Sequence, residues 1–252
     1  MKKISVLLVV HNEEKQISEC LEKLYFSDEI VVILDKCTDN TLRIVKKFTN
    51  KYFSGSWEIE GDRRNYGIEK CKNEWILEID ADERVDLNLS KEILHTIKNS
   101  KYDWHQINVD NYINRKLVKY GWGAYFGKSS YAGLFRKNCK NWGFQRVHPK
   151  ITLLGNKGDN LKNHLTHYYC DSIKDLIKKL DSYSSARALD LEKENKNENI
   201  FTNIRRIFSR FWKCYILRKG YKEKEIGLAI AISAGLYPIL SYLKYKTETK
   251  ND

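Results

Sequence analysis

The chain has 252 residues, enough for one large core or for a core with an appended region. Its 42% hydrophobic and 31% charged residues are typical of a soluble protein, and six cysteines without paired spacing argue against a disulfide-stapled secreted domain and for a cytoplasmic one. The net charge of +12 at pH 7 indicates an anionic partner, which would be nucleic acid, a membrane surface or a phosphorylated substrate.

The first third of the chain predicts strands that alternate with helices. Apolar runs rich in β-branched residues predict buried strands at 4–10 and 29–35, and WILEID predicts a third at 75–80. Helical spacing predicts one helix at 13–26 with Asn12 as its N-cap, one after Thr38 or Asp39, and one at 62–71. Continuous apolar strands of this kind predict a parallel sheet with helices on both faces.

Polar residues follow each of these three strands at its carboxyl end. They are His11 and Asn12, then Asp35 and Asp39, then Asp80 and Asp82. Ligands of parallel sheets bind outside the carboxyl ends of the strands. We therefore expect these side chains to form one site.

Asp80 and Asp82 form an Asp-x-Asp motif within WILEIDADER. Carboxylate oxygens are hard ligands that select Mg²⁺ or Mn²⁺, and such a metal can hold a pyrophosphate. An isolated motif of this kind is equally an acidic turn before a helix, so it depends on its surroundings.

The surroundings favour a nucleotide. Asp35 and Asp39 bracket a tight turn, where one carboxylate can accept from a nucleobase N–H or a ribose hydroxyl while the other caps a helix. Arg64 follows at a predicted helix start, and an arginine there attracts phosphate.

Between about 100 and 170 the helical period fades, and aromatic residues and glycines are dense. The alternation in HQINVDNYIN predicts strands, and GWGAYFGKSSYAG at 121–133 predicts a loop. The aromatic side chains of this loop either pack over the edge of the sheet or offer a surface on which a sugar ring stacks.

The last third predicts helices. One spans 172–193, a polar linker follows at 193–199, and 200–216 forms an amphipathic helix with Arg206, Arg210 and Lys213 opposite its apolar side. Residues 227–243 carry no charge. This pattern predicts a peripheral anchor on an anionic membrane; the alternative is that both helices pack on the domain or on a second subunit.

The order of these motifs resembles the family 2 glycosyltransferases of the GT-A fold. The matching segments are ISVLLVVHNEE, ILDKCTDNT, GDRRNYGIE and IDADE. VHPKI at 147–151, HLTHYY at 164–169 and FWKCYILRKGY resemble the branch of lipopolysaccharide inner-core glucosyltransferases. The resemblance implies a mixed, mainly parallel α/β sheet in a GT-A domain at 1–170, with a helical region at 171–252.

The resemblance also implies roles for the residues at the strand ends. The nucleotide-sugar would be held by Val10, His11, Asn12, Asp35 and Asp39, with Arg64 near its phosphates. Asp80 would contact the ribose or a metal-bound water, and Asp82 would bind the Mg²⁺ or Mn²⁺ that bridges the diphosphate.

The general base departs from the family pattern. An inverting transfer needs a base for the acceptor hydroxyl, and the pattern expects an aspartate a few residues before Leu134-Phe135-Arg136. Ser129 stands there instead. His148 is a candidate base because histidine titrates near neutrality, and its alternative role is structural or acceptor-binding.

The expected protein is a metal-dependent inverting glycosyltransferase, cytoplasmic and peripheral to the inner membrane. It would move a hexose from a UDP-sugar to a membrane-associated glycan or a lipid-linked acceptor in lipopolysaccharide or related envelope synthesis. A nucleotidyltransferase is the first alternative, although a glycine-rich loop does not follow the first strand. A nucleic-acid-binding protein is the second, but it leaves the acidic residues at three strand ends unexplained. A catalytically inactive relative that acts as a scaffold is the third, because the acid is missing before Leu134.

Overall fold

The computed structural model describes residues 2–122, 126–146, 149–194 and 198–248. The chain forms two compact units. The N-terminal unit comprises Met1–Val109, Ser130–Gln145 and Pro149–His167, and the C-terminal unit comprises Asp110–Ser129, Arg146–His148 and Tyr168–Asp252. Residues 110–129 thus group with the C-terminal helices, and the sequence-based domain boundary at residue 170 stays a prediction.

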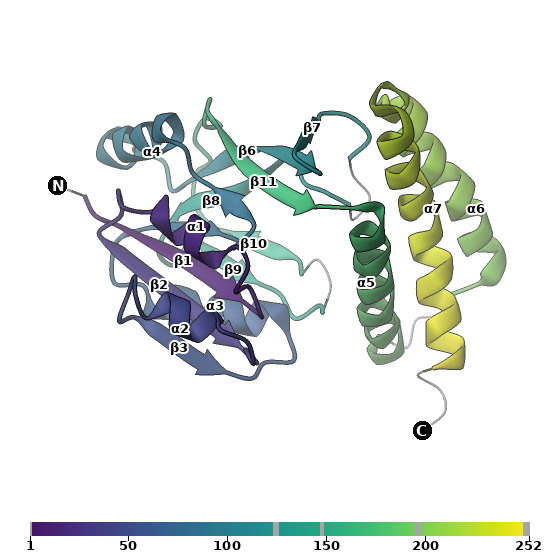
Figure 1. Ribbon diagram of the computed structural model, residues 1–252, viewed down its shortest axis with the longest axis horizontal. Helices are drawn as coiled ribbons and strands as arrows, with labels where there is room; N and C mark the ends of the chain where they lie inside the picture. Colours follow the sequence, from purple (N-terminus) through teal and green to yellow (C-terminus); the bar gives the residue numbers. More distant parts are fainter. Residues whose placement is uncertain (1, 123–125, 147–148, 195–197, 249–252) are drawn as a thin grey trace. The chain divides into compact units, whose positions relative to one another are not determined.

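A mixed sheet organises the fold, with strand order β3-β2-β1-β4-β8-β6-β11-β5 and β7 paired to β6 (Figure 1). Its N-terminal strands pair in parallel, and the pairs β4–β8, β8–β6, β6–β7 and β11–β5 are antiparallel. Strands β9 and β10 form a separate two-stranded sheet. The strands are β1 (Ile4–Val10), β2 (Glu29–Asp35), β3 (Tyr52–Gly55), β4 (Trp75–Ile79), β5 (Glu83–Arg84), β6 (Trp104–Ile113), β7 (Lys116–Val118), β8 (Ser130–Arg136), β9 (Lys140–Trp142), β10 (Ile151–Leu153) and β11 (His164–Cys170).

Helices cover both faces of the parallel strands, as predicted. Val6 and Leu8 of β1 pack in one buried cluster that includes residues of α1 and α4, whereas Leu7 packs in another with Ile33 of β2 and Ile68 of α3. This division follows from the period of two along a strand. The helices of this unit are α1 (Ile17–Glu22), α2 (Thr41–Val45), α3 (Glu60–Lys70) and α4 (Leu87–Asn99).

The predicted strands 4–10 and 29–35 coincide with β1 and β2, but the first helix is shorter than predicted. Asn12 is not its N-cap, because its backbone is left-handed (φ 54°) and its side-chain oxygen accepts from the Thr38 N–H at 2.8 Å. Three elements before residue 100 are absent from the prediction. They are β3, which is only four residues long, the two-residue strand β5, and α4, whose buried Leu89, Ile93 and Ile97 do repeat at helical spacing.

The predicted loop at 121–133 is too long, because its last four residues belong to β8. Two of its aromatic residues are core residues. Trp122 and Phe126 are buried in a cluster that includes Leu176, Leu180 and Tyr237. Neither of these two described aromatic side chains therefore offers a surface to a sugar.

The C-terminal unit is mainly helical, as predicted. Helix α5 (Ile173–Lys193) begins at Ser172, whose hydroxyl accepts from the Asp175 N–H, and α6 (Ile200–Trp212) begins at Asn199, whose side chain accepts from the Phe201 N–H. A π-helix (Lys213–Leu217) and a 3-10 helix (Gly220–Glu223) lead into α7 (Lys224–Thr247). Residues Gly220–Thr247 are long and apolar enough to cross a membrane by length and composition only, and half of their most apolar window is buried inside the protein.

Candidate functional site

The carboxyl ends of β1, β2 and β4 meet at one edge of the sheet. In the parallel register, Val10 at the end of β1 lies beside Leu34 of β2, and Leu8 lies beside Ile79 at the end of β4. The residues that follow these strands are therefore neighbours, which is the arrangement that the sequence predicted.

The loops after β1 and β2 are tied to each other. Asn12 accepts from the backbone N–H groups of Thr38 and Asp39, at 2.8 and 3.3 Å. His11 Nδ1 lies 2.7 Å from the carbonyl oxygen of Asp35. These contacts fix the backbone around Asp35 without using its carboxylate.

Asp35 and Asp39 have different partners. The buried Asp35 accepts from the Trp57 N–H at 3.0 Å and forms an ion pair with Arg63 at 2.6 Å. Asp39 accepts from the backbone N–H groups of Glu14 and Thr41, both at 3.0 Å. Burial would raise the pKa of Asp39, but its hydrogen bonds with Thr41 and Glu14 hold that pKa below the usual value. Asp39 thus holds the turn before α2.

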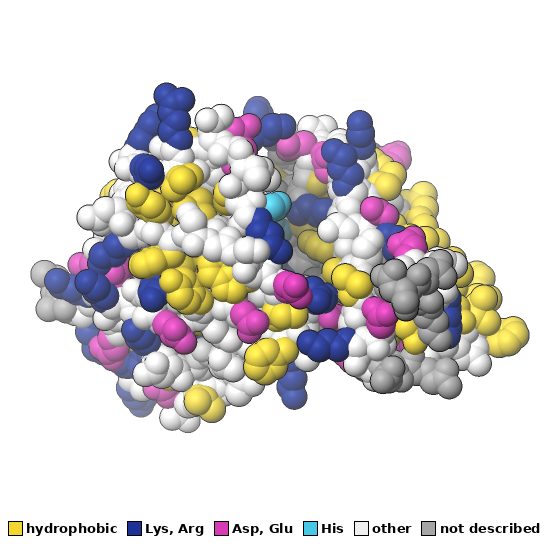
Figure 2. Space-filling view, turned by 90° about the horizontal axis from the view of Figure 1, so that it is seen from below, with side chains coloured by type: hydrophobic (Ala, Val, Ile, Leu, Met, Phe, Trp, Pro, Cys, Tyr) yellow, Lys and Arg dark blue, Asp and Glu magenta, His cyan; other side chains and the backbone are white. Residues whose placement is uncertain are grey.

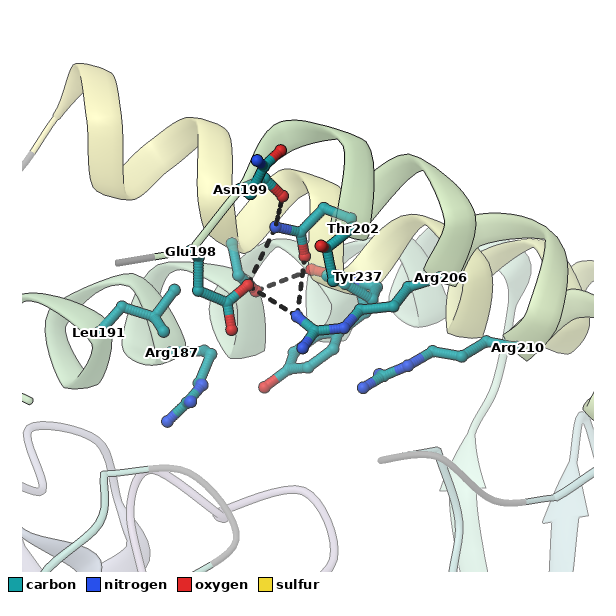
Figure 3. Close-up of a pocket in the computed structure, with 11 residues that line it drawn as sticks. Arg187, Leu191, Glu198, Asn199, Thr202, Arg206, Arg210 and Tyr237 are labelled. Atoms are coloured by element: carbon teal, nitrogen blue, oxygen red, sulfur yellow. Dashed lines mark hydrogen bonds and ion pairs between the residues drawn. The ribbon is translucent and has the colours of Figure 1, made fainter. Parts of the chain in front are cut away.

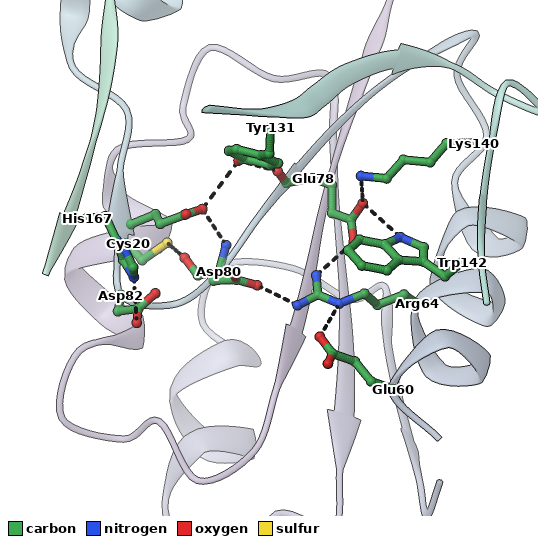
Figure 4. A network of polar contacts seen from close by, with 11 residues as sticks. Cys20, Glu60, Arg64, Glu78, Asp80, Asp82, Tyr131, Lys140, Trp142 and His167 are labelled. Atoms are coloured by element: carbon green, nitrogen blue, oxygen red, sulfur yellow. Dashed lines mark hydrogen bonds and ion pairs between the residues drawn. The ribbon is translucent and has the colours of Figure 1, made fainter. Parts of the chain in front are cut away.

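Arg64 of α3 binds three carboxylates (Figure 4). Its guanidinium donates to Glu60 at 2.9 Å, to Glu78 at 2.7 Å and to Asp80 at 3.0 Å, and it stacks 4.7 Å from the centre of the Trp142 ring. Burial would lower the pKa of Arg64, but the charges of Asp80, Glu60 and Glu78 raise it well above the usual value. Arg64 is therefore a permanent cation that orients Asp80, and the predicted contact of Arg64 with phosphate stays a prediction.

Glu78 and Lys140 form an ion pair behind Asp80, at 2.7 Å and with both side chains buried. Glu78 also accepts from Trp142 Nε1 at 3.2 Å, and Lys140 donates to the Ala132 carbonyl oxygen at 2.9 Å. Burial would raise the pKa of Glu78, but the charges of Lys140 and Arg64 lower it below the usual value. Good geometry and additional hydrogen bonds are what a buried ion pair needs in order to offset its desolvation.

The sequence prediction missed Glu78 and Lys140. A signal was present for Glu78, because it is a charged residue within the apolar run WILEI. Lys140 lies 62 residues away on β9, and its local sequence carries no comparable signal.

Asp82 lies beside His167 of β11, with His167 Nε2 at 3.2 Å from Asp82 Oδ2. Strand β11 pairs with β5 so that His167 faces Glu83 in the register. His167 was not assigned a role from the sequence, although the alternating burial of β11 places it on the buried side. The pair brings together a carboxylate and an imidazole, which both bind divalent metals.

The described residues hold no group of three or more His, Cys, Asp or Glu side chains placed for a metal. The Asp82–His167 pair fits a divalent ion that takes its other ligands from water and a diphosphate, because Mg²⁺ sites in phosphate-binding enzymes use only one or two carboxylates. An oxygen and a nitrogen ligand together suit Mn²⁺ at least as well as Mg²⁺.

For the acceptor side of the site, the described residues do not include the candidate general base. His148, the candidate base, lies outside the described residues, and Ser129 is exposed just before β8. The acid nearest in sequence to the Asp-x-Asp motif is Glu83, which is fully buried and accepts from the Asp80 N–H at 2.9 Å. Glu83 therefore supports the backbone of the motif.

Comparisons with known proteins identify the family. The model of glycosyl transferase family 2 matches residues 5–155. An uncharacterized glycosyltransferase of Rickettsia typhi is 26% identical, over 88% of this chain and 79% of that protein. The lipopolysaccharide core biosynthesis glycosyltransferase LpsC of Rhizobium meliloti is 22% identical, over 96% of this chain and 91% of that protein.

Among solved structures, a TarS fragment from S. aureus in complex with UDP aligns with a TM-score of 0.49 and 18% identity, over 89% of this chain and 75% of that chain. The family match confirms the family that the sequence motifs resemble, and the mixed sheet with flanking helices confirms the predicted fold class. The chain belongs to glycosyl transferase family 2.

Proposed function

We propose that this chain is a metal-dependent, inverting glycosyltransferase that moves a hexose from a UDP-sugar to a membrane-associated glycan or a lipid-linked acceptor. The observation that carries this proposal is the meeting of Asp35, Asp80 and Asp82 with His167 near one edge of the sheet. Transfer from a diphosphate donor needs a positive charge beside the departing diphosphate. It also needs oriented carboxylates at the same place to hold the nucleotide and the metal ion.

Each residue of the edge has a part in this proposal. The loops around Val10, His11 and Asn12 would position the uracil and the ribose against Asp35. Arg64 holds Asp80 for the ribose or a metal-bound water. Asp82 and His167 would hold Mg²⁺ or Mn²⁺, and the ion would neutralise the charge that develops on the departing UDP. His148 is the proposed base that takes the proton of the acceptor hydroxyl.

The likeness to LpsC, whose name places it in lipopolysaccharide core biosynthesis, supports a role in lipopolysaccharide or related envelope glycan assembly.

A cytoplasmic position on the inner membrane fits six free cysteines and the exposed side of α6. Phe201, Phe208 and Trp212 are exposed on this helix, next to the exposed Arg205. In Figure 2, hydrophobic side chains gather at the right-hand edge, over the C-terminal helices. Large apolar side chains flanked by cations fit an anionic membrane surface.

Thermal unfolding with and without nucleotide tests the donor half of the proposal. We expect UDP-sugars to raise the melting temperature in the presence of Mn²⁺, and we expect Asp82→Ala to abolish the rise. The matched control is Asp28→Ala, which removes a carboxylate at the opposite end of the sheet, beside Ile4. If no UDP-sugar shifts the unfolding of the unaltered protein, the proposed donor is wrong.

A further inference from the structure

The C-terminal unit contains a cavity of about 380 Å³ between α5, α6 and α7 (Figure 3). Small-molecule sites typically have volumes of about 300–1,000 Å³. Arg187, Arg206 and Arg210 line the cavity, and Glu198 is the one carboxylate among its described lining residues. The donor residues of the proposed sugar transfer lie in the other unit, so this cavity is a separate feature.

Helix α6 turns a polar row toward this cavity and exposes several large apolar side chains, while its Phe211 packs on the buried cluster of the same unit. Asn203 is fully buried and lines the cavity together with Arg206 and Arg210, which follow it three and seven residues later. Phe201 and Phe208, on the other side, are 76% and 71% exposed. A surface helix of a soluble protein normally keeps such large apolar side chains on its buried side. The exposed phenylalanines therefore indicate an apolar environment outside, and the inward polar row indicates a polar ligand inside.

Two of the arginines, Arg187 and Arg206, are only partly engaged by the described residues. Glu198 binds Arg206 through Nη1 at 2.7 Å, and Nη1 also donates to Asn203, so among the described residues Nε and Nη2 of Arg206 remain to donate. Arg187 lies 3.5 Å from Glu194 and 4.0 Å from Asp190, which is too long for a tight ion pair.

The remaining arginine is held against the wall of the cavity. The guanidinium carbon of Arg210 lies 5.9 Å from the centre of the Tyr237 ring, within the range of a cation–π contact. Figure 3 shows the side chains of Arg206 and Arg210 extending in the same direction from α6, and Arg187 lines the same cavity from α5. A planar guanidinium fork matches the oxygens of a phosphate group, and a phosphate can replace a carboxylate as its partner.

We propose that this cavity binds the phosphate group of an amphiphilic ligand. The first turn of α6 adds to the attraction, because Asn199 and Thr202 also line the cavity and a helix N-terminus favours an anion. We infer an amphiphilic ligand because the same helix also has exposed apolar side chains. These side chains would contact the acyl chains of the ligand while the arginines bind its phosphate. The phosphate belongs either to the head group of a membrane lipid or to a lipid-linked acceptor.

Calorimetric titration with a soluble short-chain phosphatidic acid tests this site. We expect Arg210→Gln to weaken binding roughly tenfold, because it removes charge-assisted hydrogen bonds to the phosphate. The matched control is Arg205→Gln, which makes the same charge change at an exposed position on the same helix, and it should change binding by less than about twofold. Short-chain diacylglycerol, which lacks the phosphate, should bind weakly and equally to both variants.

Arg210→Lys and the melting temperatures of all variants separate binding from folding. If Arg210→Gln lowers the melting temperature, Arg210→Lys must still bind more weakly than the unaltered protein at a temperature where both are folded, because lysine lacks the fork. If Arg205→Gln and Arg210→Gln lose the same amount of affinity for the phosphatidic acid, the effect is one of general charge and the proposal is overturned. The proposal is also overturned if neither variant loses affinity.

Two further measurements identify the source of the phosphate. If it is a lipid head group, Arg210→Gln reduces retention on vesicles that contain phosphatidic acid and leaves the KM for the acceptor in detergent unchanged. If it belongs to the acceptor, Arg210→Gln raises that KM, and phosphatase treatment of the acceptor removes the difference. The calorimetric titration does not depend on sugar transfer. The phosphate site can therefore be confirmed or rejected even if the proposed enzymatic function is wrong.

Discussion

His167 Nε2 lies 3.2 Å from Asp82 Oδ2, although 85 residues separate the two in the chain. The contact arises because β11 pairs with the short strand β5, which directly follows the Asp-x-Asp motif. The antiparallel half of the sheet thus brings an imidazole to a carboxylate that the parallel half presents. A metal site built this way would depend on both halves of the sheet.

His167→Ala should weaken the binding of Mn²⁺ in the presence of UDP at least about tenfold, because it removes a metal ligand or the partner that orients one. The electron paramagnetic resonance signal of free Mn²⁺ measures this affinity directly. His95→Ala is the matched control, since His95 is exposed on α4. Unchanged Mn²⁺ affinity in His167→Ala would show that Asp82 holds the ion without the imidazole.

Lys140→Met should destabilise the protein by about 3 kcal/mol, at the lower end of the effect of breaking a buried ion pair, because Arg64 still pairs with Glu78. Urea unfolding measures the change. The control is Lys150→Met, which alters an exposed lysine. Combining Lys140→Met with Glu78→Gln should recover part of the loss; additive losses would mean that the two side chains are not coupled.

The residues of the candidate site show which contacts can be predicted from the sequence and which cannot. Asp35, Asp80 and Asp82 were predicted to be neighbours because they lie at or just after the carboxyl ends of apolar strands, and parallel strands bring their ends together. Lys140 and His167 come from strands whose pairing is not visible in local sequence. Strand register between distant segments depends on tertiary packing, so their contacts with Glu78 and Asp82 could not be derived.

Helix α6 shows the same limit. The apolar spacing of Ile204, Phe208 and Trp212 predicted an amphipathic helix, and the structure contains it. The pattern could not tell which side faces the protein, because an apolar stripe fits a protein core and a membrane equally well. The inward side carries the buried Asn203 as well as Phe211, and this mixed inward side is visible only in the structure.

Glu78 should make the stability of the protein depend on pH. Its pKa in the folded protein lies below the ordinary value of 4.5, so its contribution is fully present above that value and is lost as the pH falls through the folded pKa. Glu78→Gln cannot titrate, so its deficit in unfolding free energy relative to the unaltered protein should narrow as the pH falls below 4.5. Urea unfolding at several pH values measures this deficit.

The control for this titration is Glu69→Gln, at an exposed position on α3. Its unfolding free energy should differ little from that of the unaltered protein, because the substitution is at an exposed position. A deficit of Glu78→Gln that widens with acidification would contradict the lowered pKa of Glu78 in the folded protein.

Phe208→Ser should reduce retention on anionic vesicles about tenfold or more, because an exposed phenylalanine that enters the membrane contributes about 1.5–3 kcal/mol. Cosedimentation with the vesicles measures retention. Tyr25→Ser, which removes a 72% exposed aromatic side chain in the N-terminal unit, is the control and should leave retention unchanged. Sedimentation velocity without lipid tests the competing explanation, a second copy of the chain on the same surface. If Phe208→Ser dissociates an oligomer and leaves vesicle retention unchanged, the exposed side of α6 is a subunit interface and the membrane proposal is wrong.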